Sequence, residues 1–154
     1  MKKIVLLAFA IGTLFSCKND DDNRATEGNY LIFGHFYGFC IGETCVQTFK
    51  VTDSKLYKDT AGDYTGQDFE FSELDNALFE EVKDVVDFLP DQLLKDNETV
   101  FGCPDCADGG GLFIQYLDNG NLKTWRIDQM KENVPSYLHN FMDKVNEKIA
   151  LINE

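Results

Sequence analysis

The asparagine–glycine pair at positions 119 and 120 constrains the fold of this chain more than any other feature. It lies between two apolar segments, residues 112–117 and 122–127. A two-residue hairpin turn of type I′ needs positive φ at both central positions, and Asn-Gly meets that need best. The turn sets this pairing: Leu117 with Leu122, Ile114 with Trp125, Leu112 with Ile127. Because residues directly opposite share a face, the sequence predicts that Trp125 lies on the core side of this hairpin and Arg126 on the other.

The rest of the chain predicts a second hairpin and two helices. Residues 30–37 and 45–51 are rich in aromatic and β-branched residues and predict paired strands, with a short third strand at residues 55–58. A helix is predicted to begin near Ser72, in a variant of the capping box, and to end before Pro90. A final helix is predicted from about Pro135 to Ile152. The order predicts an α+β fold: an antiparallel sheet of about four strands with two helices packed on one face.

The first 17 residues have the pattern of a secretory signal. Lys2 and Lys3 precede an uncharged apolar run, residues 4–16, which is too short to span a bilayer as a stable helix. The run ends in Leu14-Phe15-Ser16-Cys17, which resembles the lipobox of bacterial lipoproteins. That resemblance implies cleavage before Cys17 and lipidation, with palmitate among the chains, on that cysteine.

An acidic run follows Cys17 at residues 18–23, Lys-Asn-Asp-Asp-Asp-Asn. It resembles the export tag behind the lipid cysteine in surface lipoproteins of Bacteroidetes; the alternative is a solvated tether, since runs of like charge repel one another. The expected organisation is a signal peptide at residues 1–16, an acidic tether at 17–28 and one globular domain at 29–154. The expected location is the outer membrane of the cell envelope, lipid-anchored and exposed at the surface if the tag acts.

Charge and motifs exclude several classes of function. The chain has 27 acidic against 14 basic residues and a net charge of -13, which disfavours nucleic acid and anionic lipid headgroups as partners. The sequence has no phosphate-binding loop, dinucleotide fingerprint, nucleophile elbow or zinc-protease motif. No catalytic site is therefore predicted. The expected partners are the membrane, through the lipid anchor, and a protein of the envelope.

Four further cysteines fall in two tight pairs, Cys40-x4-Cys45 and Cys103-x2-Cys106, in glycine-bearing loops that lead into strands. If the two hairpins are neighbours, both loops lie at one end of the sheet. An even number of cysteines in an exported chain favours structural disulfides. Three connectivities are open. A bridge between the pairs would close a loop of about 60 residues and stabilise the fold most.

Two alternatives for these cysteines remain open. Cys40, Cys45, Cys103 and Cys106 could bind zinc or copper through four thiolates, with His35 as a weak additional candidate. Alternatively, Cys103-Pro104-Asp105-Cys106 looks like the Cys-Pro-x-Cys of some thiol oxidoreductases. The predicted strand after it, however, does not supply the helix N-terminus that lowers the pKa of a reactive cysteine.

The first cysteine loop, Tyr37-Gly38-Phe39-Cys40-Ile41-Gly42-Glu43-Thr44-Cys45, resembles a motif in bacterial lipoprotein domains of unknown activity. The resemblance implies the same order of hairpins and helices, and no reaction. Three further groups of residues have a structural interpretation, and the first of them also has a functional one. Phe36, Tyr37 and Phe39 are core residues or an exposed aromatic patch. Asp105, Asp108, Asp118 and Asp128 are turn residues, and Glu80, Glu81 and Asp84 form a solvated helix face. Together these features predict a lipoprotein that serves as a binding or structural accessory module.

Overall fold

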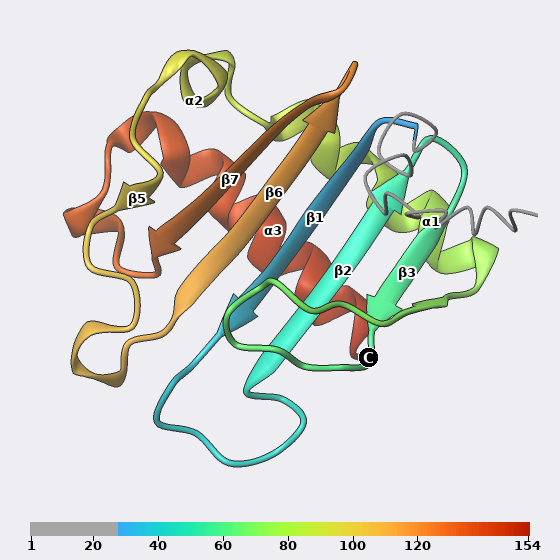
Figure 1. Ribbon diagram of the computed structural model, residues 1–154, viewed down its shortest axis with the longest axis horizontal. Coiled ribbons are helices and arrows are strands. Elements are labelled where there is room, and N and C mark those ends of the chain that lie inside the picture. Colours follow the sequence, from blue (N-terminus) through green and yellow to red (C-terminus); the bar gives the residue numbers. More distant parts are fainter. Residues whose placement is uncertain (1–27) are drawn as a thin grey trace, which may run out of the picture.

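Seven strands form one sheet in residues 28–154, the part of the chain that the computed structural model describes (Figure 1). The strand order is β4-β3-β2-β1-β6-β7-β5. All neighbouring strands are antiparallel except β5 and β7, which are parallel. The bounds are β1 Tyr30–Phe36, β2 Val46–Thr52, β3 Leu56–Asp59, β4 Phe71–Glu73, β5 Val100–Phe101, β6 Gly111–Asp118 and β7 Asn121–Asp128. The predicted signal segment, the predicted lipidation site Cys17 and the acidic run lie outside the described residues.

The predicted sheet of about four antiparallel strands is wrong, because the sheet is mixed and has seven strands. The class remains α+β, but it is richer in sheet. The two strands that the sequence did not predict are β4, with three residues, and β5, with two. Segments this short show no period of two, so nothing in the local sequence predicts them. The parallel pairing of Val100 with Arg126 also depends on how the chain returns to the sheet.

The β6–β7 hairpin has the predicted register. Leu117 pairs with Leu122 and Ile114 pairs with Trp125. Asn119 and Gly120 have φ values of 49° and 82°, as a type I′ turn requires. Trp125 is 1% exposed, so the Asn-Gly turn places its ring in the core.

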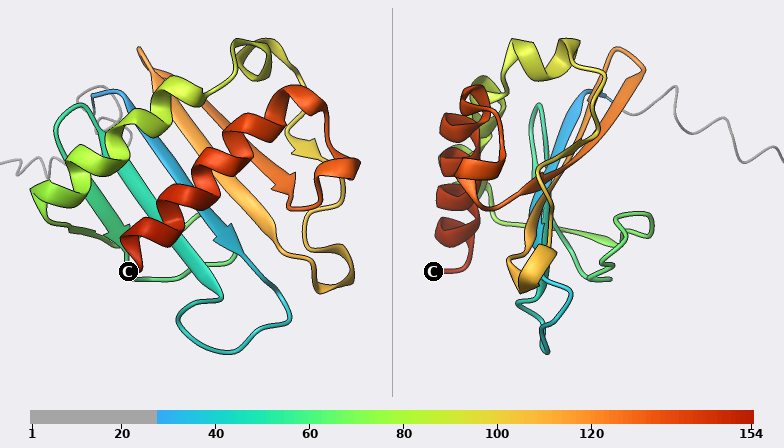
Figure 2. Two further views of the ribbon diagram at one scale, coloured as in Figure 1. Left: turned by 180° about the vertical axis from the view of Figure 1, so that it is seen from behind. Right: turned by 90° about the vertical axis from the view of Figure 1, so that its left-hand side faces the viewer.

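The helices cover one face of the sheet (Figure 2). The α-helices are α1 Asn76–Val82, α2 Asp91–Lys95 and α3 His139–Ile152. Short 3₁₀ helices lie at Lys83–Phe88, Cys106–Asp108, Lys131–Asn133 and Ser136–Leu138. No helix among residues 28–154 has the length and apolar character needed to cross a bilayer.

Both predicted helix starts are wrong. Ser72 lies in β4, and the N-cap of α1 is Asp75, whose carboxylate accepts a hydrogen bond of 2.8 Å from the Ala77 N–H. The last helix begins at His139, because Pro135 is extended and a 3₁₀ turn follows it. Asp and Ser are nearly equal in their preference for the N-cap. The pairing of β4 with β3 places Ser72 in a strand, and the helix therefore begins after Asp75.

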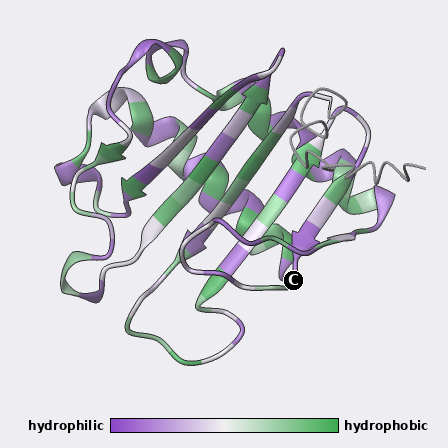
Figure 3. Cartoon of the chain, viewed as in Figure 1, coloured by the Kyte–Doolittle hydropathy of each residue, from purple (hydrophilic) through white to green (hydrophobic). Residues whose placement is uncertain are grey.

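The two faces of the sheet bury very different amounts of apolar side chain. Between the sheet and the helices lies a large cluster, with Trp125 and Phe33 from the strands and Phe141 from α3. On the other face the apolar cluster is much smaller, with Ile32, Phe36 and Phe113 as its buried members. Figure 3 shows apolar residues recurring along the central strands and also in the loop between β1 and β2.

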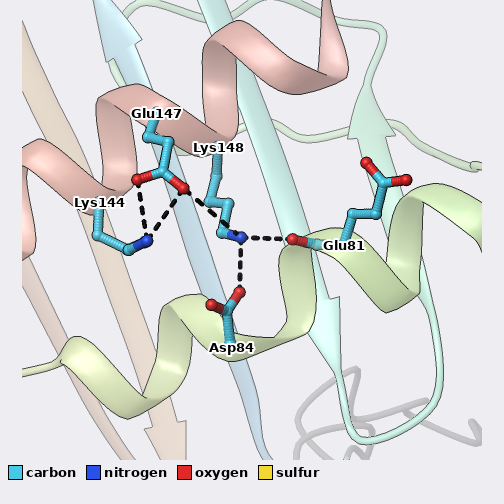
Figure 4. A network of polar contacts seen from close by, with 5 residues as sticks. All are labelled: Glu81, Asp84, Lys144, Glu147 and Lys148. Atoms are coloured by element: carbon cyan, nitrogen blue, oxygen red, sulfur yellow. Dashed lines mark hydrogen bonds and ion pairs between the residues drawn. The ribbon is translucent and has the colours of Figure 1, made fainter.

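A lysine ties the two helical segments together (Figure 4). Lys148 of α3 is 5% exposed. Its Nζ lies 2.7 Å from the Asp84 Oδ1 and also donates to the Glu81 carbonyl oxygen. Glu147 lies 3.9 Å from the same ammonium and pairs with Lys144. The predicted solvated face at residues 80–84 is therefore partly wrong, because Asp84 neutralises a charge at the helix interface.

Candidate binding surface

Both cysteine loops lie at the same end of the sheet, the lower end in Figure 1. Residues 37–45, the first cysteine loop, connect β1 to β2, and residues 102–110, the second cysteine loop, lead into β6. Phe36 at the end of β1 pairs with Val46 on one side and with Gly111 on the other. The antiparallel register of β1 with both neighbours therefore brings the two loops side by side.

The first cysteine loop is held by contacts at its base and across it. Cys40 and Cys45 form a disulfide, with Cα atoms 5.6 Å apart. The Tyr37 N–H donates to the Cys45 carbonyl oxygen at 2.9 Å. His35 Nε2–H donates to the Thr44 carbonyl oxygen at 3.0 Å. Burial lowers the pKa of His35, so this ring is neutral at pH 7 and braces the loop as a hydrogen-bond donor.

The tip of this loop presents two apolar side chains to solvent. Phe39 is 86% exposed and Ile41 is fully exposed, one on each side of Cys40, which is itself exposed and bonded to Cys45. Large apolar side chains with so little burial contribute almost nothing to the stability of the domain. Their exposure on a cross-linked loop is typical of a contact surface.

The second cysteine loop is anchored to the end of β7. Asp128 is buried, and its carboxylate accepts hydrogen bonds from the Cys103 N–H at 3.0 Å, the Met130 N–H at 2.9 Å and the Asn133 side-chain amide at 2.8 Å. Burial alone would raise the pKa of Asp128, but these donors outweigh it and the pKa is lowered. The anchor is therefore a carboxylate that stays ionised.

The backbone of the second cysteine loop adopts an uncommon conformation. Asp105, Ala107 and Asp108 have φ values of 65°, 52° and 58°, although residues other than glycine rarely occupy this region. The disulfide between Cys103 and Cys106, with Cα atoms 5.4 Å apart, closes around Asp105. Such a conformation persists when its surroundings fix it, and here the disulfide and the Asp128 anchor do so.

Asp105 joins the two cysteine loops. Its Oδ2 accepts a hydrogen bond of 2.8 Å from the Gly38 N–H in the first cysteine loop and one of 2.9 Å from the Tyr64 hydroxyl. Its Oδ1 accepts from the Gly110 N–H at 3.1 Å. One carboxylate thus connects three segments of the chain. Tyr64 keeps its proton because burial and the neighbouring Asp105 raise its pKa.

The third of these segments is the cover loop, residues 60–70, which crosses the face of the sheet opposite to the helices (Figure 2). Two carboxylates organise it. Asp59 accepts from the N–H groups of Ala61 and Gly62 at 3.2 and 3.0 Å. Asp63 accepts from Thr65 and from the Gln67 N–H, and these hydrogen bonds lower its pKa well below the usual range.

Arg126 attaches the cover loop to the sheet. Its guanidinium lies 3.9 Å from the centre of the Phe36 ring and 5.1 Å from that of Tyr64. It also donates to the carbonyl oxygens of Tyr64 and Thr65 at 3.3 and 3.4 Å. Gly66 lies on Phe113, where a Cβ atom would come within 2.4 Å of the ring. Arg126 thus packs between the sheet and the loop.

An open cleft of about 1030 Å³ lies between the first cysteine loop and the cover loop. Tyr37, Glu43 and Cys45 line one side, and Lys58 and Tyr64 line the other. The exposed tip of the first cysteine loop borders this cleft. Together they form a surface with an apolar projection beside a polar hollow, and a surface of this shape can hold a partner.

The disulfides fall within the predicted pairs, and none joins one loop to the other. A bridge across the two loops, the connectivity of highest expected stability, is therefore absent among residues 28–154. In this paired state none of the four sulfurs is a free thiolate. His35 reaches the Thr44 carbonyl, and within the described residues no three His, Cys, Asp or Glu side chains are placed to share a metal ion.

Sequence reasoning missed the roles of two residues of this surface, Ile41 and Asp105. Ile41 lies between Cys40 and Gly42 in an apolar stretch, and its composition resembles that of a core segment. Asp105 was expected to be an ordinary turn residue. Its partners Gly38 and Tyr64 are 67 and 41 positions away, so no local pattern could connect them. Of the predicted aromatic patch, Phe39 is exposed, whereas Phe36 is buried under Arg126.

Comparison with models of known protein families and with curated proteins found no match to this chain.

Proposed function

We propose that this chain is a lipoprotein of the cell envelope and that its domain is a binding or accessory module, with the tip of the first cysteine loop as its contact. The observation that carries the proposal is the exposure of Phe39 and Ile41 on a loop closed by the Cys40–Cys45 disulfide. Apolar anchors on rigid supports supply much of the energy of protein contacts. No catalytic activity is proposed.

Rigidity matters because ordering a loop opposes binding. Immobilising side chains and loops costs free energy that must be offset by the new contact. Here the disulfide, the His35 hydrogen bond and the Asp105 hydrogen bond to Gly38 fix the loop before a partner arrives. The cost of binding is thereby reduced.

The anchor is the second element of the proposal. The lipobox-like segment ending in Cys17 supports a chain held at the outer membrane through several acyl chains, because a single chain binds only marginally. The variant Cys17→Ser should release the protein from membranes and should not incorporate labelled palmitate. Membrane attachment of this variant, together with a wild type that incorporates no label, would contradict the anchor.

The contact itself is tested by the size of the complexes that contain the chain. The variant carrying Phe39→Ser and Ile41→Ser should migrate as a smaller species than the wild type in native gels of envelope extracts. The matched control carries Leu122→Ser and Met130→Ser, at positions 41% and 46% exposed. Migration of both variants like the wild type would refute the loop as the contact.

Thiol redox chemistry is the second candidate, favoured by the exposed pair Cys103 and Cys106 at Cys-x2-Cys spacing. Zinc or copper ligation would need all four sulfurs in the reduced state. Counting free thiols in protein from the envelope, with and without reductant, separates these alternatives. Four thiols in the native protein and a melting temperature lowered by chelator would favour the metal. Rapid reduction of one pair by a dithiol would favour redox chemistry.

A further inference from the structure

Carboxylates outnumber cations around the exposed loop tip. Glu43 on the first cysteine loop and Asp108 on the second are both exposed carboxylates. Asp63 in the cover loop adds a third, which its hydrogen bonds hold in the ionised form. Lys58 is the one cation among the residues that line the cleft. Phe39 and Ile41 therefore project from a surface whose field is negative.

The position of the first described residues relative to the loop tip matters as well. The described residues begin at Gly28, two positions before the first residue of β1, and the first cysteine loop follows the last residue of β1. Seven residues of extended strand separate the two, a distance of roughly 20 Å. The loop tip therefore lies at the end of the sheet opposite to the start of β1 (Figure 1).

We propose that the partner is a protein whose surface has an apolar pocket for Phe39 and Ile41, bordered by lysine and arginine side chains. This inference rests on the proposed binding function and adds the chemistry of the partner to it. The basic border pairs with Glu43, Asp63 and Asp108, which speeds association and selects against acidic partners.

The two other possible occupants fit less well. A second copy of this chain would bring the same carboxylates together, and like charges across an interface oppose association. A membrane with anionic headgroups would be repelled in the same way. A basic protein surface with an apolar pocket fits both the exposed Phe39 and Ile41 side chains and the negative charge around them.

The test uses the full chain with its disulfides intact and a random peptide library displayed on phage as the probe. Selected peptides should combine aromatic or aliphatic residues with lysine and arginine. Their affinity should fall with rising salt, because screening at ~0.1 M acts over about 10 Å. The variant Glu43→Gln with Asp108→Asn should slow association about tenfold. The matched control, Asp53→Asn with Asp118→Asn at the far end of the sheet, should leave it unchanged.

Several results would overturn the inference. Selection of acidic or uncharged peptides would do so, as would equal association rates for the Glu43 and Asp108 variant and its control. A concentration-dependent dimer lost on Phe39→Ser would identify a second copy as the occupant, and loop-dependent binding to phosphatidylcholine vesicles would identify a membrane. In all these cases the loop remains the contact. If no selected peptide loses affinity for the variant Phe39→Ser with Ile41→Ser, the proposed binding function fails as well.

Discussion

The two faces of the sheet are covered in different ways. On one face, three α-helices bury a continuous apolar cluster that includes Trp125 and Phe141. On the other, the cover loop lies over three buried residues and is held mainly by carboxylates and by Arg126. Figure 2 shows both layers from the edge of the sheet. The contrast indicates that the helical face supplies most of the stability.

The loop-covered face therefore has a different role. Its hydrogen bonds converge on Asp105 and Asp63, and these fix the positions of loops more than they bury surface. A loop held by polar contacts can project apolar side chains that a packed layer would bury. The comparison predicts that substitutions behind the helices change stability and that substitutions at the cysteine end change binding.

The largest effect on stability is expected behind the helices. Trp125→Ala should lower the free energy of unfolding by about 3–5 kcal/mol, as for other large aromatics removed from a core. Arg126→Ala, the next residue and on the opposite face, should cost about 1 kcal/mol from its loss of cation–π and hydrogen-bond contacts. Urea midpoints measure both. Equal losses would show that the two faces contribute alike.

The next largest loss of stability is expected from substitution of Asp128, a buried polar anchor at the border between the helical face and the loop-covered face. Asp128→Ala leaves the N–H groups of Cys103 and Met130 without their acceptor and should cost about 3 kcal/mol. Because folding lowers the pKa of Asp128, its contribution is complete above the unfolded value of about 3.9 and is lost as the pH falls through the folded value.

The difference in unfolding free energy between wild type and Asp128→Ala should therefore shrink below about pH 4. Urea titrations at several pH values measure it. A constant difference down to pH 2 would contradict the ionised anchor.

Substitution of Lys148 tests how the helical layer contributes to stability at a position that is not aromatic. Lys148→Ala removes the packed side-chain stem and the hydrogen bond to the Glu81 carbonyl and should cost about 2 kcal/mol. Lys148→Met keeps the volume and should stay within about 1 kcal/mol of the wild type, since buried ion pairs often give no net gain over apolar residues. Chemical denaturation of both variants is the measurement. A larger loss for Met than for Ala would mean that the ion pair, not packing, holds α3 to the Lys83–Phe88 segment.

Substitution of Asp105 should have a smaller effect on stability, but it should make the first cysteine loop clearly less ordered. Asp105→Ala removes the acceptor for Gly38 and Tyr64 and should cost about 1 kcal/mol. The amide of Gly38 should then exchange with solvent faster, because it loses its partner. Hydrogen exchange at Gly38, compared with Asp118→Ala at the far end, measures this. Unchanged exchange at Gly38 would refute the link between the two cysteine loops.

The sequence predicts what depends on neighbouring residues. The Asn119-Gly120 turn fixes the register of β6 and β7 because its backbone requirement is local. The pairs Cys40–Cys45 and Cys103–Cys106 are also close in sequence, so proximity alone makes them reachable. The parallel strand β5 and the start of α1 at Asp75 depend on distant pairing and were not predictable.

The same distinction applies to the candidate surface. Phe39 was recognised as a possible exposed aromatic from its neighbours. Whether it is buried or exposed depends on the body of the domain, which the local pattern does not contain. The role of Asp105 depends on Tyr64, which reaches it only because the cover loop folds back over the sheet.

The most direct test of the account is photocrosslinking in living cells from a benzophenone amino acid placed at position 39, compared with position 122. Both side chains are solvent-exposed, but Leu122 lies at the opposite end of the sheet. We expect a defined crosslinked adduct from position 39 and none from position 122. Equal adducts from both positions, or no adduct from position 39 in a correctly folded chain, would contradict it.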